Sequence, residues 1–304
     1  MTALTDEFRF LPGDAQRVGR TAPAPRVERV WAEVTEGRRV SGLAFAPERA
    51  PAHVFLHGAG LNAHGYDPTI LALDAPALSL DLPGHGRSDW RADAAYRPDL
   101  LAPDVTLALA HLAPEPVTLV GHSLGGLTAI AVAASRPQAI RELVVLDISP
   151  GLVPQRQTGS ITDFITGQRD FASHEEMVDR AIAFGIGHDR VSLARGVALN
   201  SRQRPDGRWE WTHHLAHLPP AQQTPQGGSL EEEPLPFVSL WQPLGELHDA
   251  GLPITLVAAS AGIVGPDLVA EWRERLPGSS VVTVEGPHNL HEAAPLEIAR
   301  LLRK

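Results

Sequence analysis

The chain of 304 residues contains no cysteine, which excludes disulfide bonds and thiolate chemistry. It has one lysine, Lys304, and its formal net charge of −10 argues against binding to nucleic acid or to an anionic membrane. It also lacks any apolar run long enough to span a bilayer, and its first ten residues have no apolar signal core. We therefore expect a soluble cytoplasmic protein that acts on a small molecule. Composition makes no prediction about oligomeric state.

Short apolar runs alternate with helical patterns along most of the chain. This alternation predicts a parallel sheet with helices on both faces, which is an α/β fold. The predicted strands are His53–Leu56, Ala77–Asp81, Val117–Val120, Glu142–Asp147, Ile254–Ala258 and Ser280–Glu285. The predicted helices are Asp99–Leu112, Leu124–Ser135, Asp267–Leu276 and Leu296–Leu302. Two runs before them, Arg29–Val34 and Arg38–Phe45, alternate around a glycine and predict a β-hairpin.

One interval interrupts this rhythm and divides the chain. Residues 150–249 contain no convincing buried strand and are rich in aromatic side chains, so we expect a mostly helical cap insertion over the carboxyl ends of the strands. Residues 27–149 and 250–304 then form the core. Residues 1–26 are polar and contain proline, and we expect a loosely attached N-terminal arm. Within the cap, residues 218–236 are predicted to be a mobile loop.

A nucleophile elbow is the strongest motif in the chain. The segment from Gly121 to Gly125 has the pattern Gly-x-Ser-x-Gly, and it lies between a predicted buried strand and a predicted helix. Such a turn holds its serine in strained backbone geometry close to a helix N-terminus. The sequence therefore predicts Ser123 as a nucleophile.

A serine nucleophile needs a base, and the base needs an orienting acid. His288 follows the last predicted strand directly, at the edge where a base can reach the elbow. His291 is the alternative base, although a role in lining the pocket suits it better.

Two backbone N–H groups are expected to bind the oxyanion. Leu124, directly after the serine, supplies the first. The second comes from the loop after the first parallel strand, and we assign it to Ala59, with Gly60 as the alternative.

With these residues in place, the chain resembles the α/β-hydrolase superfamily, and most closely its capped bacterial esterase-like members. The resemblance rests on His57-Gly58, Asp81–Ser88, Gly121–Gly126 and Gly286-Pro-His288, with Leu61–His64 and Asp206–Trp209 as further similarities. It implies an eight-stranded, mostly parallel sheet and hydrolysis through an acyl-enzyme, without a cofactor.

The triad acid is where the chain departs from this family. The usual acid follows the strand predicted at Ile254–Ala258, but glycine stands near that place, at Gly262. Asp147, at the end of the strand next to the elbow strand, is the best replacement. Asp267 and the absence of any functional acid remain alternatives.

Several further residues are candidates for the substrate pocket or are set aside. The pocket candidates are His57, Gly58, Gly60, His122, His291, Trp209 and Trp241. The histidines at 213, 214 and 217 have a spacing that a metal could use, but no carboxylate or cysteine lies nearby, so we expect no metal site. Gly84-His-Gly86 lacks the third glycine of a dinucleotide-binding motif.

These features predict a serine hydrolase that cleaves an ester, lactone or thioester with a small-to-medium apolar acyl group. The alternatives are hydrolysis of a C–C bond on the same scaffold, and a binding protein that has lost its acid.

Overall fold

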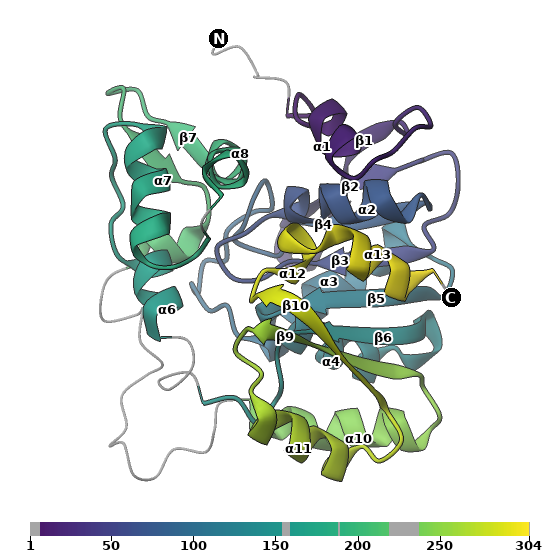
Figure 1. Cartoon of the computed structure of the whole chain (residues 1–304). Helices are drawn as coiled ribbons and strands as arrows, with labels where there is room; N and C mark the ends of the chain where they lie inside the picture. The colour runs from purple at the N-terminus through teal and green to yellow at the C-terminus, as the bar shows by residue number, and fades with distance from the viewer. Residues whose placement is uncertain (1–6, 154–158, 188, 219–236, 304) are drawn as a thin grey trace.

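A computed structural model of the chain describes residues 7–153, 159–187, 189–218 and 237–303. One sheet runs through its centre, with helices on both sides (Figure 1). The sheet has eight strands in the order β1-β2-β4-β3-β5-β6-β9-β10. These are β1 Val27–Glu33, β2 Arg39–Phe45, β4 Ala77–Leu80, β3 His53–Leu56, β5 Val117–His122, β6 Ile140–Leu146, β9 Ile254–Ala261 and β10 Ser280–Pro287. Strands β1, β2 and β4 pair antiparallel and all other neighbours pair parallel, so the prediction of a mostly parallel eight-stranded sheet is confirmed.

Successive residues of the central strands enter two different hydrophobic clusters. Val54 and Leu119 belong to one cluster, whereas their neighbours Phe55 and Val120 belong to the other, because adjacent side chains point to opposite faces of a sheet. The first face is covered by α3 Pro98–Leu112, α4 Leu124–Ser135, α10 Trp241–Asp249 and α11 Pro266–Arg275. The second is covered by α1 Leu11–Arg17, α2 Asp67–Leu73, α12 Leu290–Ala293 and α13 Pro295–Leu302. Short 3₁₀ turns are η1 Thr35–Gly37, η2 Ala63–Tyr66, η3 Pro137–Ala139 and η5 Val238–Leu240.

The N-terminal segment is not loosely attached, and that prediction is wrong from residue 7 onward. Leu11 and Val18 are buried in the second cluster. Glu7 forms an ion pair with Arg29 of β1, with a distance of 2.6 Å between Oε2 and Nη2. The sequence analysis missed helix α1 because its sequence is polar, contains proline and offers few apolar residues for packing on α2.

The cap is a separate group of elements beside the sheet (Figure 1). It comprises α6 Gly159–Thr166, α7 His174–Ala183, α8 Arg190–Asn200, the hairpin β7 Ser201–Gln203 with β8 Trp209–Trp211, and η4 His214–His217. It has its own small core, which includes Phe171, Met177 and Trp211. The sequence analysis missed the hairpin because its strands are only three residues long.

The cap also ends earlier than residue 249, where the sequence placed its boundary. Helix α10 lies within 150–249, yet Leu244 and Leu247 are buried in the sheet's first cluster, so α10 belongs to the core. The segment 218–236, predicted to be mobile, lies almost wholly outside the described residues.

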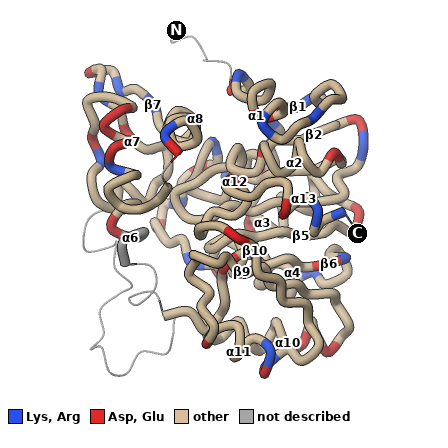
Figure 2. Tube along the Cα trace, in the orientation of Figure 1, with Lys and Arg blue, Asp and Glu red and all other residues tan. Residues whose placement is uncertain are grey.

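Charged side chains are dispersed over the described chain. Figure 2 shows arginine and acidic residues interspersed around the cap and the outer helices. None of the helices in the described ranges combines the length and the apolar character that crossing a bilayer requires.

Candidate active site

Ser123 forms the turn between β5, which ends at His122, and α4, which begins at Leu124. Its backbone has φ 53° and ψ −122°, in the region that L-residues rarely adopt. A Cβ at Gly121 would lie 2.3 Å from the carbonyl oxygen of Gly125, and a Cβ at Gly125 would lie 2.2 Å from a carbonyl oxygen of β3. The two glycines therefore allow the close packing that this strained turn requires.

His288 and Asp147 meet at the carboxyl edge of the sheet. Asp147 follows β6 and His288 follows β10. The distance between His288 Nδ1 and Asp147 Oδ2 is 2.7 Å, so the imidazole donates a hydrogen bond to the carboxylate. The Asp147 side chain is fully buried, and that of His288 is 15% exposed. The pair thus has the base–acid geometry of a serine hydrolase.

Backbone amides surround the carboxylate of Asp147. Oδ1 accepts from the N–H groups of Ala259 at 3.0 Å and Val264 at 3.3 Å, and Oδ2 accepts from Ile263 N–H at 2.9 Å. Together with the bond to His288, these donors satisfy the hydrogen-bonding capacity of a carboxyl group that is fully buried. They also hold it rigidly, because the donors belong to the end of β9 and the turn after it.

Gly262 gives this carboxylate its space. A Cβ at position 262 would lie 2.0 Å from Asp147 Oδ2, so the acid occupies the volume that any side chain at 262 would fill. Asp267, the alternative acid, lies exposed in the first turn of α11. The structure therefore brings Asp147, and not Asp267, to His288.

His122, the residue before Ser123, lies beside the imidazole of His288. The ring centroids of His122 and His288 are 4.4 Å apart, and His122 precedes Ser123 in the chain. Within the described residues, the Ser123 hydroxyl has no hydrogen bond to His288. In serine hydrolases without substrate this bond is often long, and it tightens when the substrate is bound.

The loop after β3 passes directly beside the serine. A Cβ at Gly58 would lie 3.2 Å from Ser123 Cβ. The backbone N–H groups of Ala59 and Leu124 donate to no acceptor among the described residues. Ala59 follows Gly58 in this loop, and Leu124 is the first residue of α4. Ile165 of the cap packs over Gly60, the residue after Ala59, since a Cβ at Gly60 would lie 3.1 Å from the Ile165 side chain.

His57 holds this loop in place. Its ring is fully buried, and burial lowers its pKa, so the imidazole is neutral. Nδ1–H donates to the Gly58 carbonyl at 2.8 Å, and Nε2 accepts from the N–H of Leu82 at 3.0 Å. His57 therefore connects the loop after β3 to the backbone of Leu82 and holds it in position.

His122 and His291 are both buried next to His288. Burial, together with the neighbouring His288, lowers the pKa of His291 to about 3 and that of His122 well below its usual value. His291 lies between His122 and Tyr66, with centroid distances of 4.5 Å to each. Neither ring nitrogen of His291 has a partner among the described residues.

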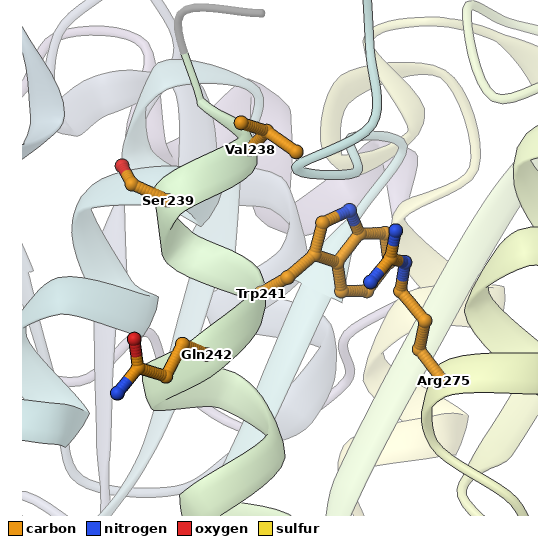
Figure 3. Close-up of a pocket in the computed structure, with 5 residues that line it drawn as sticks. All are labelled: Val238, Ser239, Trp241, Gln242 and Arg275. Atoms are coloured by element: carbon orange, nitrogen blue, oxygen red, sulfur yellow. The ribbon is translucent and has the colours of Figure 1, made fainter. Parts of the chain in front are cut away.

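The two tryptophans predicted for the pocket lie elsewhere. Trp209 packs on His174 within the cap, with ring centroids 3.7 Å apart. Trp241 is buried against Trp272 in the sheet's core, at a centroid distance of 5.7 Å. It borders a cavity of about 550 Å³ that is lined also by Arg275 and by residues of η5 and α10 (Figure 3). Aromatic composition had suggested a pocket, but these side chains fill cores.

The histidines at 213, 214 and 217 make separate contacts. His213 accepts from the N–H of Ala216, His214 stacks on Trp90 with centroids 4.2 Å apart, and His217 bonds to the carbonyl of Trp211. No group of residues in the described ranges has an arrangement that would hold a metal ion.

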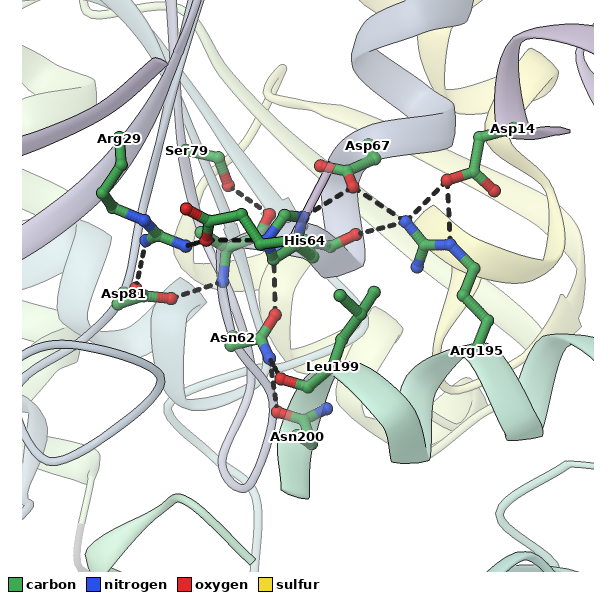
Figure 4. A network of polar contacts seen from close by, with 12 residues as sticks. Asp14, Arg29, Asn62, His64, Asp67, Ser79, Asp81, Arg195, Leu199 and Asn200 are labelled. Atoms are coloured by element: carbon green, nitrogen blue, oxygen red, sulfur yellow. Dashed lines mark hydrogen bonds and ion pairs between the residues drawn. The ribbon is translucent and has the colours of Figure 1, made fainter. Parts of the chain in front are cut away.

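A buried ionic network joins the cap to the core and to the N-terminal segment (Figure 4). Arg195 of α8 lies 2.7 Å from Asp14 Oδ2 and 2.8 Å from Asp67 Oδ2. Asp67 also accepts from His64 Nδ1 at 2.8 Å. Burial opposes a charge on His64, but Asp67 and Glu7 outweigh it and raise its pKa to about 9.

Asn62 connects the same cap helix to the loop after β3. Its amide nitrogen donates to the carbonyl of Leu199 at 2.8 Å and to Asn200 Oδ1 at 2.7 Å. The N–H of the next residue, Ala63, donates to Oδ1 of the buried Asp81 at 2.8 Å. The sequence analysis missed Arg195, Asp14 and Asp67, since only the resemblance at 61–64 indicated that this segment mattered.

The Alpha/beta hydrolase family matches residues 54–301, and the chain belongs to this family. Esterase Rv0045c of Mycobacterium tuberculosis is 36% identical over 308 residues, which span 98% of this chain and 95% of that relative. A solved structure of the same M. tuberculosis esterase covers 98% of both chains with a TM-score of 0.82. Lipase LipV of the same organism is 28% identical over 83% of this chain and 92% of its own length. The predicted fold and the prediction of a hydrolase of the esterase and lipase type are both confirmed.

Proposed function

We propose that the chain is a serine esterase in which Ser123 is the nucleophile, His288 the general base and acid, and Asp147 the orienting acid. The observation that carries this assignment is the 2.7 Å hydrogen bond between His288 and Asp147, made in the space that Gly262 leaves empty. It favours an enzyme over a binding protein, because the missing acid was the only support for a lost activity.

Acylation begins when His288 Nε2 takes the proton of the Ser123 hydroxyl and Oγ attacks the ester carbonyl. The N–H groups of Leu124 and Ala59 bind the resulting oxyanion. His288 then gives its proton to the leaving alcohol, the C–O bond breaks, and Ser123 is left acylated. Water, deprotonated by His288, releases the acid by the same steps in reverse order. Asp147 stabilises the imidazolium that forms in each half.

The substrate is proposed to be a small molecule with a small-to-medium apolar acyl group. Ile165 supports this, because its side chain packs over Gly60 beside the predicted oxyanion donors. The esterase and lipase names of the relatives agree with an ester substrate.

The test combines a fluorophosphonate probe with hydrolysis of p-nitrophenyl esters. We expect covalent labelling of Ser123 that Ser123→Ala and His288→Ala abolish. Asp147→Asn should lower kcat by about 10⁴-fold, because the amide cannot stabilise the imidazolium and favours the wrong tautomer. Asp267→Asn is the matched control and should leave kcat unchanged. Loss of turnover in Asp267→Asn but not in Asp147→Asn would refute the assigned acid.

A further inference from the structure

One buried imidazole touches all three segments of the proposed site. His122 adjoins the nucleophile Ser123 in the chain. Its Nε2 lies 3.0 Å from the carbonyl oxygen of His288. Its Nδ1 faces the loop after β3, where a Cβ at Gly58 would lie 2.7 Å from it. The ring therefore spans the gap between the nucleophile, the base and the oxyanion loop.

Only one protonation state fits these contacts. A carbonyl oxygen can only accept, so Nε2 carries a proton and donates a hydrogen bond to the backbone carbonyl of His288. Burial, followed by the nearby His288, His291 and His57, keeps the pKa of His122 well below its usual value, so Nδ1 has no proton. Nδ1 is buried with no partner among the described residues. An unpaired buried acceptor is costly, and such groups in native structures call for a functional explanation.

The bond to His288 fixes the loop that carries the base. His288 lies between Pro287, the last residue of β10, and the short helix α12, and its carbonyl oxygen also accepts from the N–H of Leu290 at 3.0 Å. Asp147 fixes Nδ1 of the imidazole, but that single bond lets the ring swing about it. The bonds from His122 and Leu290 both act on the backbone of the same residue, and the bond from His122 connects it to the end of β5, next to Ser123.

We propose that His122 is a positioning residue for catalysis: it holds the backbone of His288, and through it the imidazole, at the correct distance from Ser123 and from the oxyanion loop. This inference rests on the proposed function. It gives His122 a role in turnover and not in substrate binding.

The test compares three substitutions at position 122. His122→Gln keeps a donor, because the Gln amide nitrogen occupies the place of Nε2. His122→Asn has the same amide on a shorter side chain that cannot reach His288. His122→Met keeps the volume and removes the donor. We expect Met and Asn to lower kcat on the order of 100-fold, the effect of about 1 Å of misplacement, with KM changed by no more than about twofold. Gln should restore kcat to within about tenfold of the wild type.

His53→Met is the matched control. His53 is also buried and also bonds a carbonyl, that of Leu302 at 3.3 Å, but it starts β3 at the opposite end of the sheet from Ser123. This control should lower the melting temperature and leave kcat unchanged. Equal kcat in His122→Gln and His122→Asn, or wild-type kcat in His122→Met, would overturn the inference.

Fluorophosphonate labelling separates failure of this inference from failure of the proposed function. A wild-type chain that does not label would refute the serine esterase itself. A wild-type chain that labels rapidly, together with His122→Met labelling at the same rate, would refute only the role of His122.

Discussion

Replacing Gly262 by alanine tests the proposed triad at its most unusual point. The new Cβ would lie 2.0 Å from Asp147 Oδ2 and 2.5 Å from the other atoms of the carboxylate group. Gly262 does not have a positive φ, so alanine fits the backbone and the effect is steric alone. The substitution therefore pushes the carboxylate without changing its charge.

The size of the effect follows from this overlap. Real Cβ contacts are essentially never shorter than 3.0 Å, so the carboxylate must move by about 1 Å or more. Such a shift breaks the 2.7 Å bond to His288 and strains the bonds from Ile263 and Val264. We expect kcat to fall by about 100-fold or more, which corresponds to about 3 kcal/mol of lost transition-state stabilisation.

The assay is steady-state hydrolysis of a p-nitrophenyl ester, with thermal unfolding measured in parallel. Gly265→Ala is the matched control, because a Cβ at that position meets no atom within 4 Å and the residue also lies in the turn before α11. It should retain wild-type kcat. A Gly262→Ala variant that keeps wild-type kcat would refute the reasoning, since Asp147 could not then be needed where the structure places it.

Two further predictions concern the ionic network. His64→Gln should remove a part of the unfolding free energy that depends on pH. The pKa of His64 is raised to about 9 in the folded protein, so its protonation contributes up to about 3 kcal/mol below the unfolded pKa of 6.5. This contribution is lost as the pH rises through 9. Urea unfolding at pH 6.5 to 9.5 checks this. The same change of unfolding free energy with pH in the variant and the wild type would contradict it. Arg195→Met should cost about 3–5 kcal/mol of unfolding free energy, because it removes from the buried Asp14 and Asp67 the guanidinium that they share. Arg190→Met, on the same helix, removes an exposed pair with Asp179 and should cost about 1 kcal/mol or less; similar losses in both variants would count against a buried network.

The sequence predicted the elements that have strong local signals. The six predicted parallel strands and the helix after Ser123 form within a few residues of their predicted bounds, because unbroken β-branched and aliphatic runs occur mainly where a sheet is covered on both faces. The elbow at Gly121–Gly125 was equally clear. Its glycines are required by close backbone contacts that involve only neighbouring elements.

Elements stabilised by distant charges could not be predicted in this way. Helix α1 has few apolar residues, and it is held by Asp14 bonding to Arg195, 181 residues away. Helix α10 reads as part of the cap in sequence order, and only its burial against α4 and α11 assigns it to the core. Asp147 remained one of several candidates, since the close approach between positions 147 and 262 exists only in three dimensions.

The network around Arg195 and Asp81 has a practical consequence for anyone shortening this protein. Trimming it to the family-matched residues 54–301 would keep Ser123, Asp147 and His288. It would also discard Arg29, whose guanidinium lies 2.6 Å from the 1%-exposed side chain of Asp81, together with the aspartate that holds α8. A shortened chain that keeps these contacts must therefore begin upstream of the segment that identifies its family.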